Sequence, residues 1–505
     1  MSGSHPRQAW DSHSPCCGSV PKTGGTSMNR LRWIPKNRFL QGIANLAILL
    51  VVVIVFAAGR PVEATQRQAA YAITNATVIT SPGNSVETAT VVLRDGLIEA
   101  VGTDVATPPD ARIIDGSGMT VYAGWIDSFS EVAIQEEPSA PPTLVTSGRG
   151  GGGRGSRGSG RQTLQMLELG SPGVNQHVNP EFIQADNLTN EDTSLAAFRD
   201  AGFTAALVVP QNGIYRGQSV LIALRETSTE EMVLNDNVAQ VVGFSTGGFG
   251  RGYPSSAMGV IALIRQVLLD TQRQATWENS FNNDPTGIPR PETNPAYTSL
   301  MPILAGDQQM IFDTNNTRDA KRGLLIAKEF GLSTIIKGNG NEYDMVDVLV
   351  DANVEVIVPV NYPDKPSVGN NDAANLDISL VALQRWEAAP GNAAAIATAG
   401  VTFAFTSDGI NPDEFAGNVR KAIEAGLPED AALAAVTINP AAMFGVDSII
   451  GTIEPGKIAN VVIATGAPFA EGTEIRHVFV DGVHTVPPGD NGDGPTNPRH
   501  DGGWK

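Results

Sequence analysis

The sequence predicts an α/β protein, in which an eight-stranded TIM-like (βα)8 barrel carries a composite β-sandwich domain built from the N- and C-terminal segments. Three observations lead to this fold class. Short strand-like runs lie near both ends of the chain, strand-like and helix-like runs alternate between them, and no G-x-G-x-x-G motif follows a strand where an open nucleotide-binding sheet would carry one. The predicted domains are residues 65–120 plus 451–486 for the sandwich and 121–450 for the barrel.

The two ends of the chain supply the strands assigned to the sandwich. Asp95-Gly96 and Asp481-Gly482 each lie between apolar runs, which is typical of a β-hairpin. Segments from opposite ends can complete one sheet when the chain between them begins and ends near the same place, as a closed barrel does. Two unrelated hairpin units are the alternative. The predicted strands are 72–79, 90–93, 97–101, 111–114, 460–465 and 475–480.

The central segment alternates between strand-like and helix-like runs, which predicts a parallel sheet. Two further strands are expected between about 211 and 310, so a closed barrel is favoured over an open doubly wound sheet. The strands recognised directly are 120–129, 204–210, 310–312, 333–337, 355–360 and 401–406. The predicted helices are 192–201, 258–274, 318–330, 343–352, 378–388, 413–425 and 428–444.

Residues 1–64 predict an export segment. A run of 14 residues without a polar side chain, 46–59, follows four basic residues, and Val62-Glu63-Ala64 suits cleavage after Ala64. The expected location is therefore periplasmic or secreted. If the segment stays uncleaved, residues 43–59 would anchor the protein in a membrane. A second start at Met28 would leave residues 1–27, with both cysteines, as an upstream extension.

The net charge of the chain indicates which partners are disfavoured, and its composition predicts two segments without regular structure. The formal net charge is −19, which disfavours nucleic acid as a partner. Residues 138–161 are rich in glycine and arginine and predict a flexible loop; RNA binding by this run is the alternative. Residues 487–505 have almost no apolar side chains and predict a disordered tail.

Several ordered motifs together resemble the amidohydrolase superfamily, and its imidazolonepropionase-like branch most closely. They are T-V-Y-A-G-W-I-D-S-F-S at 120–130, A-G-F-T-A-A-L-V-V-P-Q-N-G-I-Y-R-G-Q-S at 201–219, T-S-D at 406–408, T-I-N-P-A at 437–441 and G-T-I-E-P-G-K-I-A-N-V-V at 451–462. The resemblance covers about residues 72–486. It implies the barrel with its β domain, hydrolysis of non-peptide C–N bonds in cyclic amides or ureas, a bound zinc ion and a homodimer.

The metal ligands of that family are replaced in this chain. The resemblance places Ser128 and Ser130 where the family has the two histidines of H-x-H on its first barrel strand. His177 is the only histidine between Thr65 and Arg476. A zinc site that needs three or four imidazoles cannot be built from one, so no residue is assigned as a metal ligand.

Three other residues remain candidates for the site. By the resemblance, Asp408 keeps the position of the family's general base and is the predicted catalytic residue. Asp313, where the family often has histidine, and His177 are possible acid–base or substrate contacts. Asp127, Asp313 and Asp408 together with the two serines offer only oxygen atoms, which would suit Mg²⁺ or Ca²⁺ rather than Zn²⁺.

Two hypotheses for the function follow. In the first, the protein is an exported hydrolase of C–N bonds that works through Asp408 with an altered or absent metal. In the second, it is a pseudoenzyme that binds a small-molecule ligand or pairs with an active amidohydrolase paralogue. Whether the chain is catalytically active stays open at this point.

Overall fold

The computed structural model describes residues 69–135, 175–245, 253–366 and 378–488, which belong to one compact unit. The predicted export segment and the glycine- and arginine-rich loop lie outside the described residues, as does the predicted tail from residue 489 onward. Within the described ranges, no helix combines the length and the apolar character needed to cross a bilayer.

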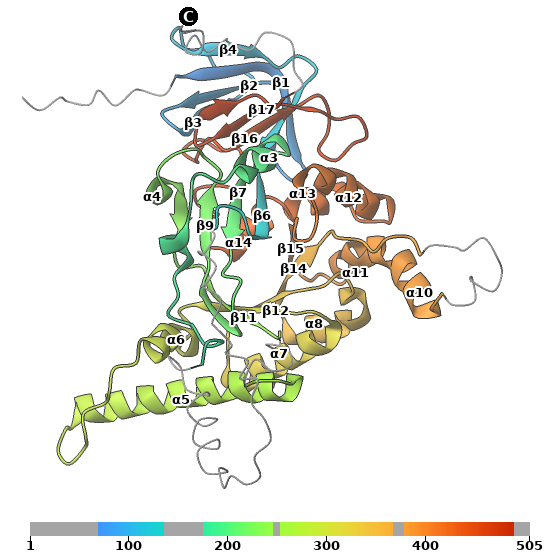
Figure 1. The fold of residues 1–505 in the computed structure, drawn as a ribbon. Coiled ribbons are helices and arrows are strands. Elements are labelled where there is room, and N and C mark those ends of the chain that lie inside the picture. The colour runs from blue at the N-terminus through green and yellow to red at the C-terminus, as the bar shows by residue number, and fades with distance from the viewer. Residues whose placement is uncertain (1–68, 136–174, 246–252, 367–377, 489–505) are drawn as a thin grey trace, which may run out of the picture. The chain divides into compact units, whose positions relative to one another are not determined.

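An eight-stranded sheet contains strands from both ends of the described chain (Figure 1). Its strands are β1 Tyr71–Ser81, β2 Asn84–Arg94, β3 Leu97–Gly102, β4 Arg112–Asp115, β5 Thr120–Ala123, β16 Val461–Ala464, β17 Ile475–Val480 and β18 Val483–Thr485. They follow the order β18-β17-β16-β5-β1-β2-β3, with β4 paired to β1. The two ends meet where β16 pairs antiparallel with β5.

Both predicted Asp-Gly turns form hairpins of this sheet, between β2 and β3 and between β17 and β18. Asp95 and Gly96 have positive φ angles of 50° and 81°, and Asp481 and Gly482 have 50° and 72°. Two successive residues with positive φ match the right-handed twist of the flanking strands, which explains why the Asp-Gly sequence predicted both turns.

Two further sheets hold the central strands. The four-stranded sheet has the order β10-β9-β7-β6 and the six-stranded sheet the order β15-β14-β13-β12-β11-β8. The strands are β6 Trp125–Ser130, β7 Phe203–Val208, β8 Tyr215–Gln218, β9 Val220–Ala223, β10 Val233–Asn235, β11 Ala239–Gly243, β12 Gln309–Asp313, β13 Thr334–Lys337, β14 Glu355–Pro359 and β15 Phe403–Thr406. β6 runs parallel to β7, and β11 to β15 run parallel to one another. The predicted α/β class is confirmed.

These two sheets are connected at one end by the chain itself and at the other end by a hydrogen bond. β8 and β9 are separated only by Ser219; β8 pairs antiparallel with β11, and β9 pairs antiparallel with β7. At the other end, the Thr406 hydroxyl donates to the carbonyl of Phe129 at 2.6 Å, linking β15 to β6. Between 211 and 310, where two strands were expected, the structure has four short strands, β8, β9, β10 and β11.

The helices follow the strands along the chain, most of them between successive parallel strands. α7 shows the local signals well: Asn316 caps its first turn by accepting from the Asp319 amide, and Gly331 with φ 68° ends it. The helices are α3 Ser194–Asp200, α4 Thr229–Met232, α5 Ala257–Asn283, α6 Pro295–Ala305, α7 Thr317–Phe330, α8 Val346–Ala352, α10 Leu380–Ala388, α11 Asn392–Thr398, α12 Pro412–Glu424, α13 Glu429–Ala434 and α14 Ile438–Met443. The short 3-10 turns are η1 Gln184–Asn187, η2 Glu342–Met345 and η3 Ala389–Gly391.

The predicted strand 120–129 is divided at Gly124 into β5 and β6, which belong to different sheets. A Cβ at Gly124 would lie 2.1 Å from a side-chain carbon of Thr204, so only glycine fits this close approach. The Gly124 amide donates to the carbonyl of Asn460, and the next amide, of Trp125, donates to Gly202. The chain therefore changes sheets at this residue.

The predicted helix 428–444 is also divided, into α13 and α14. The carbonyls of Ala435 and Val436, between the two helices, accept hydrogen bonds from the amides of Phe405 and Ile126. These are amides of β15 and β6, so the break in the helix provides acceptors for two strands.

Side-chain alternation along the parallel strands separates two apolar clusters. One contains Ile311, Ile335, Ile357 and Ala404, one residue from each of β12 to β15. Their strand neighbours, such as Phe312 and Ile336, belong to the other cluster, which includes helix residues. Residues two positions further along a strand lie on the same face as Ile311 and Ile335, and these residues are Asp313 and Lys337.

Candidate functional site

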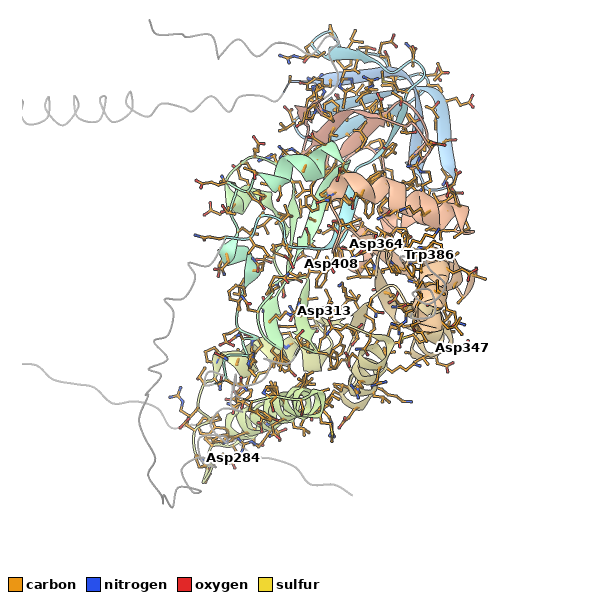
Figure 2. All side chains as sticks on the ribbon, turned by 45° about the vertical axis from the view of Figure 1, so that its right-hand side comes forward. Asp284, Asp313, Asp347, Asp364, Trp386 and Asp408 are labelled. Atoms are coloured by element: carbon orange, nitrogen blue, oxygen red, sulfur yellow. The ribbon has the colours of Figure 1, made fainter. Side chains whose placement is uncertain are left out.

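Four charged side chains form a continuous chain of ion pairs at the ends of the central strands. The Arg216 Nη2 atom donates to Asp313 Oδ2 at 2.6 Å. The Lys337 Nζ atom lies 3.5 Å from Asp313 Oδ1 and 2.5 Å from Asp408 Oδ2. We call these four residues the ion chain. In Figure 2, Asp313 and Asp408 lie near one another, whereas Asp284, beside the end of α5, lies far from both.

The strands bring the members of the ion chain together. Asp313 and Lys337 are the last residues of β12 and β13, which are parallel neighbours, and they are directly paired in the register. Arg216 comes from β8, where it can lie over Gly243: a Cβ there would be 2.6 Å from Arg216 Nη2. The glycine at the end of β11 therefore leaves the space that the guanidinium occupies.

The ion chain is largely removed from solvent. The side chains of Arg216, Lys337, Asp313 and Asp408 are 7%, 11%, 15% and 30% exposed. Two positive and two negative charges balance, and buried charges require such pairing. Burial lowers the pKa of Lys337, but the charges of Asp313 and Asp408 and their hydrogen bonds outweigh it and raise this pKa above its ordinary value. Lys337 is thus a permanent cation at neutral pH.

Phe129 completes the surroundings of Lys337. The ammonium lies 5.0 Å from the centroid of the Phe129 ring, within the range of a cation–π contact. Phe129 belongs to the same apolar cluster as Ile311 and Ile335, so it fixes the ammonium from the side of the core. A cation held by two carboxylates and a ring face has little freedom to move.

Asp127 lies apart from the ion chain, in a buried network with Ser407. Its two carboxylate oxygens accept from the Ser407 amide at 3.1 Å and from the Ser407 hydroxyl at 2.6 Å. Burial raises the pKa of Asp127 to about 6, although hydrogen bonds from Ser407 and Thr406 oppose the rise. These contacts join β6 to the residues that follow β15, so Asp127 holds the segment that carries Asp408.

Ser128 and Ser130 are both buried, but their surroundings differ. The Ser128 hydroxyl has no hydrogen-bond partner among the described residues. The Ser130 hydroxyl accepts from the Val132 amide at 3.3 Å, and Ser130 lines a cavity together with Asp408. The pairing of β6 with β7 is irregular between Asp127 and Ser130. Because of this irregularity, the rule that alternate residues of a strand share one face does not apply to Ser128 and Ser130.

His177 lies in the segment before η1. Its carbonyl accepts from the amides of Ile214 and Tyr215, while its Nε2 atom is buried without a hydrogen-bond partner among the described residues. No hydrogen bond joins His177 to Asp408 in the part of the chain that the structure describes. The sequence placed His177 in the site as a possible acid–base partner, and that role stays a prediction.

Two cavities lie beside opposite ends of the ion chain. One of about 380 Å³ is lined by Asp408, Ser130 and Phe129 among others. The other, of about 370 Å³, includes Arg216, Phe182 and several side-chain amides in its lining. A ligand in the first cavity would meet Asp408 and the exposed Glu131, and a ligand in the second would meet Arg216 and the exposed Glu181.

The donor set does not fit a zinc ion. Ser128 and Ser130 offer only hydroxyl oxygens, and the Lys337 ammonium lies beside Asp408. With Nζ 2.5 Å from Asp408, the positive charge that a metal would bring to this carboxylate is already present. Within the described ranges, no group of three or more His, Cys, Asp or Glu side chains is arranged to hold a metal.

Sequence reasoning missed Arg216 and gave Lys337 no role. A signal existed for both, because each is a charged residue in a short strand whose neighbours are apolar or small, and a buried charge needs a partner. The identity of the partners could not be read from the sequence, since Lys337 and Asp408 are 71 residues apart.

The last part of the described chain matches a known protein family. Residues 388–484 match the model of the Amidohydrolase family. This range contains Asp408 and the motifs at 437–441 and 451–462. Adenine deaminase 1 of Desulfotalea psychrophila is 39% identical over 64 residues, which are 13% of this chain and 10% of that protein. Adenine deaminase 2 of Jannaschia sp. is 40% identical over 65 residues, again 13% and 10%. The chain therefore spans about a tenth of the length of the curated relatives it matches.

The likeness to solved structures extends over most of the chain. An amidohydrolase from Thermotoga maritima MSB8 superposes with a TM-score of 0.64 at 22% identity, covering 83% of this chain and 100% of that one. A molinate hydrolase superposes with a TM-score of 0.47 at 14% identity, covering 83% and 95%. The first of these shows that the chain has the mixed α/β fold of an amidohydrolase.

Proposed function

We propose that the whole chain is a member of the amidohydrolase superfamily, in its imidazolonepropionase-like branch, with a closed barrel and a composite β sandwich. The match at 388–484, the structural likeness and the motif at 201–219 support this proposal. A closed barrel would have eight positions in the order β6, β7, β8 with β9, β11, β12, β13, β14 and β15. The strand formed by β8 and β9 would run antiparallel to both neighbours.

We further propose that the protein binds a small-molecule ligand and does not carry out metal-dependent hydrolysis. The observation that carries this proposal is the Lys337 ammonium 2.5 Å from Asp408. Hydrolysis of an amide at neutral pH needs an activated water, and a divalent metal supplies it by lowering the pKa of that water. A lysine ammonium can balance charge but cannot coordinate water in this way, because its nitrogen has no acceptor site or vacant position while protonated.

The ion pair also makes Asp408 a poor general base. Its Oδ2 atom already accepts from the Lys337 ammonium, so this oxygen is occupied and cannot accept a proton from a water molecule in the same position. At the end of β6, Ser128 and Ser130 are buried, and the exposed Glu131 lines the same cavity as Asp408. Binding therefore accounts for the charged residues and the two cavities without a reaction that they are unsuited to perform.

A metal-independent hydrolase of C–N bonds is the second candidate. The match to the Amidohydrolase family and the partial exposure of Asp408, 30%, beside a cavity favour it. In this case a ligand that displaced Lys337 from Asp408 would free the carboxylate to accept a proton from water.

Metal analysis and activity assays on the full purified chain separate these candidates. For the binding protein we expect less than about 0.1 zinc per chain and no hydrolysis of cyclic amides or ureas, with or without added zinc. Stoichiometric zinc with chelator-sensitive hydrolysis would refute it. Chelator-insensitive hydrolysis that Asp408→Asn abolishes would support the second candidate. Asp347→Asn, on the exposed face of α8, is the matched control and should change nothing.

Export and assembly complete the proposal. The charged and apolar pattern of residues 30–64 supports an exported protein, periplasmic or secreted. N-terminal sequencing of material recovered from outside the cytoplasm would test this proposal, and a chain that still began at Met1 or Met28 would contradict cleavage.

Pairing with an active amidohydrolase paralogue or with a second copy of this chain is compatible with a binding role. The mass of the native particle would distinguish a monomer from either dimer.

A further inference from the structure

We infer that the groove between α7 and α8 binds a long-chain carboxylate, the chemistry of a fatty acid. The two helices follow neighbouring parallel strands and together line a cavity of about 590 Å³ (Figure 1). This volume falls within the range of small-molecule sites. None of the four residues of the ion chain lines the groove, so this inference goes beyond the ligand proposed for the strand ends.

Apolar side chains form most of the groove. Leu325 of α7 is 66% exposed, and a ligand in the groove would remove part of this surface from water. The other apolar lining residues are Leu324, Ala327, Leu332, Val348, Ala352 and Val354. Apolar surface that is gathered in one cavity, rather than scattered singly, favours an apolar ligand.

The groove is long enough for an extended hydrocarbon chain. Its lining follows α7 from Lys321 to Gly331, just past the end of the helix. At a rise of about 1.5 Å per residue, this stretch is about 15 Å long. An extended chain of about twelve carbon atoms has nearly this length.

The charges of the lining place the carboxylate at one end of the groove. Because β12 and β13 are parallel, α7 and α8 return in the same direction and end at the same edge. Lys328 and Asp351 both lie in the last turns of their helices, at this edge, so their charges offset each other.

Lys321 remains as the cation at the other end, in the first half of α7. Its ammonium forms no ion pair with a residue that the structure describes, so its charge is available to a carboxylate. A cation at one end and an apolar lining along the rest match a ligand with a charged head and a single hydrocarbon chain. The chain supplies most of the affinity and the head group sets the orientation.

Two probes of different length test the inference on the full chain. Dodecanoate spans the groove and octanoate covers only part of it, and both are titrated calorimetrically below the concentrations at which micelles form. We expect dodecanoate to bind at least about tenfold tighter than octanoate. Lys321→Gln should weaken both probes about threefold and keep this preference. Lys421→Gln, an exposed lysine of α12, is the matched control and should change neither affinity.

A substitution that fills the groove tests its position. Ala352 is exposed at the end away from Lys321, so Ala352→Trp can block that end without disturbing the core. It should reduce the preference for dodecanoate to less than about threefold, because the longer chain can no longer extend past the part that octanoate covers. Ala262→Trp, at an exposed alanine of α5, should retain the preference.

Three results would overturn the inference. The first is equal binding of the two probes, or no binding of dodecanoate up to about 1 mM. The second is an unchanged preference in Ala352→Trp when its urea midpoint equals that of the parent chain. The third is a native particle of twice the chain's mass that Ala352→Trp converts to a monomer, since a second copy would then cover the groove.

Discussion

The ammonium nitrogen of Lys337 lies 2.5 Å from a carboxylate oxygen of Asp408, and this contact joins the ends of β13 and β15. Asp313 shares the same ammonium at 3.5 Å and is held in turn by Arg216. A fixed cation thus takes the electrostatic place that a metal would have beside these carboxylates. The consequence is a charged but neutralised centre at the ends of these strands.

Lys337→Met is expected to destabilise the fold at pH 7. It leaves Asp313 and Asp408 close to each other without their shared cation, and we expect a loss of about 1 to 3 kcal/mol in the free energy of unfolding, measured with urea. Adding Asp408→Asn removes the unpaired charge and should restore part of the loss. Additive effects of the two single variants would contradict the shared ion chain. Lys328→Met, on the exposed face of α7, is the control.

Zinc should not bind when histidines are supplied only at the two serines of β6. In Ser128→His with Ser130→His, the Lys337 ammonium still lies beside Asp408 and repels a second cation. We expect stoichiometric zinc only after Lys337→His is added, measured by elemental analysis after gel filtration. Zinc in the double variant, with an unfolding transition like that of the parent chain, would show that Lys337 does not block the site.

Asp127 should make stability depend on pH between about 4 and 6. Its pKa is raised to about 6 in the folded chain, against an ordinary value of 3.8, so the folded state keeps a proton that the unfolded chain loses. This contribution is fully present below about pH 4 and is lost as the pH rises through 6, up to about 3 kcal/mol. In Asp127→Asn, urea unfolding across this range should show a smaller decline with pH than in the parent chain. Parallel profiles would contradict the raised pKa; Asp347→Asn is the control.

Gly124→Ala should disrupt the point where the chain changes sheets. The added Cβ would lie 2.1 Å and 2.2 Å from side-chain atoms of Thr204, so the strands must separate, at a cost of about 2 to 3 kcal/mol. Because Thr204 supplies these atoms, Thr204→Ala in the same chain should recover part of the loss. Gly391→Ala, where nothing lies within 4 Å of the added carbon, should have little effect in the same urea assay. An equal loss with and without Thr204→Ala would mean that another contact limits this position.

Many of the turns and strands could be predicted from the sequence, because they depend on residues that are close together along the chain. The Asp-Gly turns at 95–96 and 481–482 determine their hairpins through backbone geometry alone, and the buried parallel strands appear as apolar runs. The boundary at Gly124 was missed, since residues 120–129 read as one continuous strand. Only the distant Thr204 and Asn460 reveal that the strand must divide there.

The sequence by itself determined the α/β class and most of the strands, because these depend on residue types and their spacing. It also pointed to Asp408 and Asp313 as candidates for the site. The tertiary structure decided that Lys337 lies between these two carboxylates and that Arg216 extends the chain of charges. Such pairings join residues far apart along the chain, and the strand register that brings them into contact is set by the packing of the whole sheet, which no local pattern encodes.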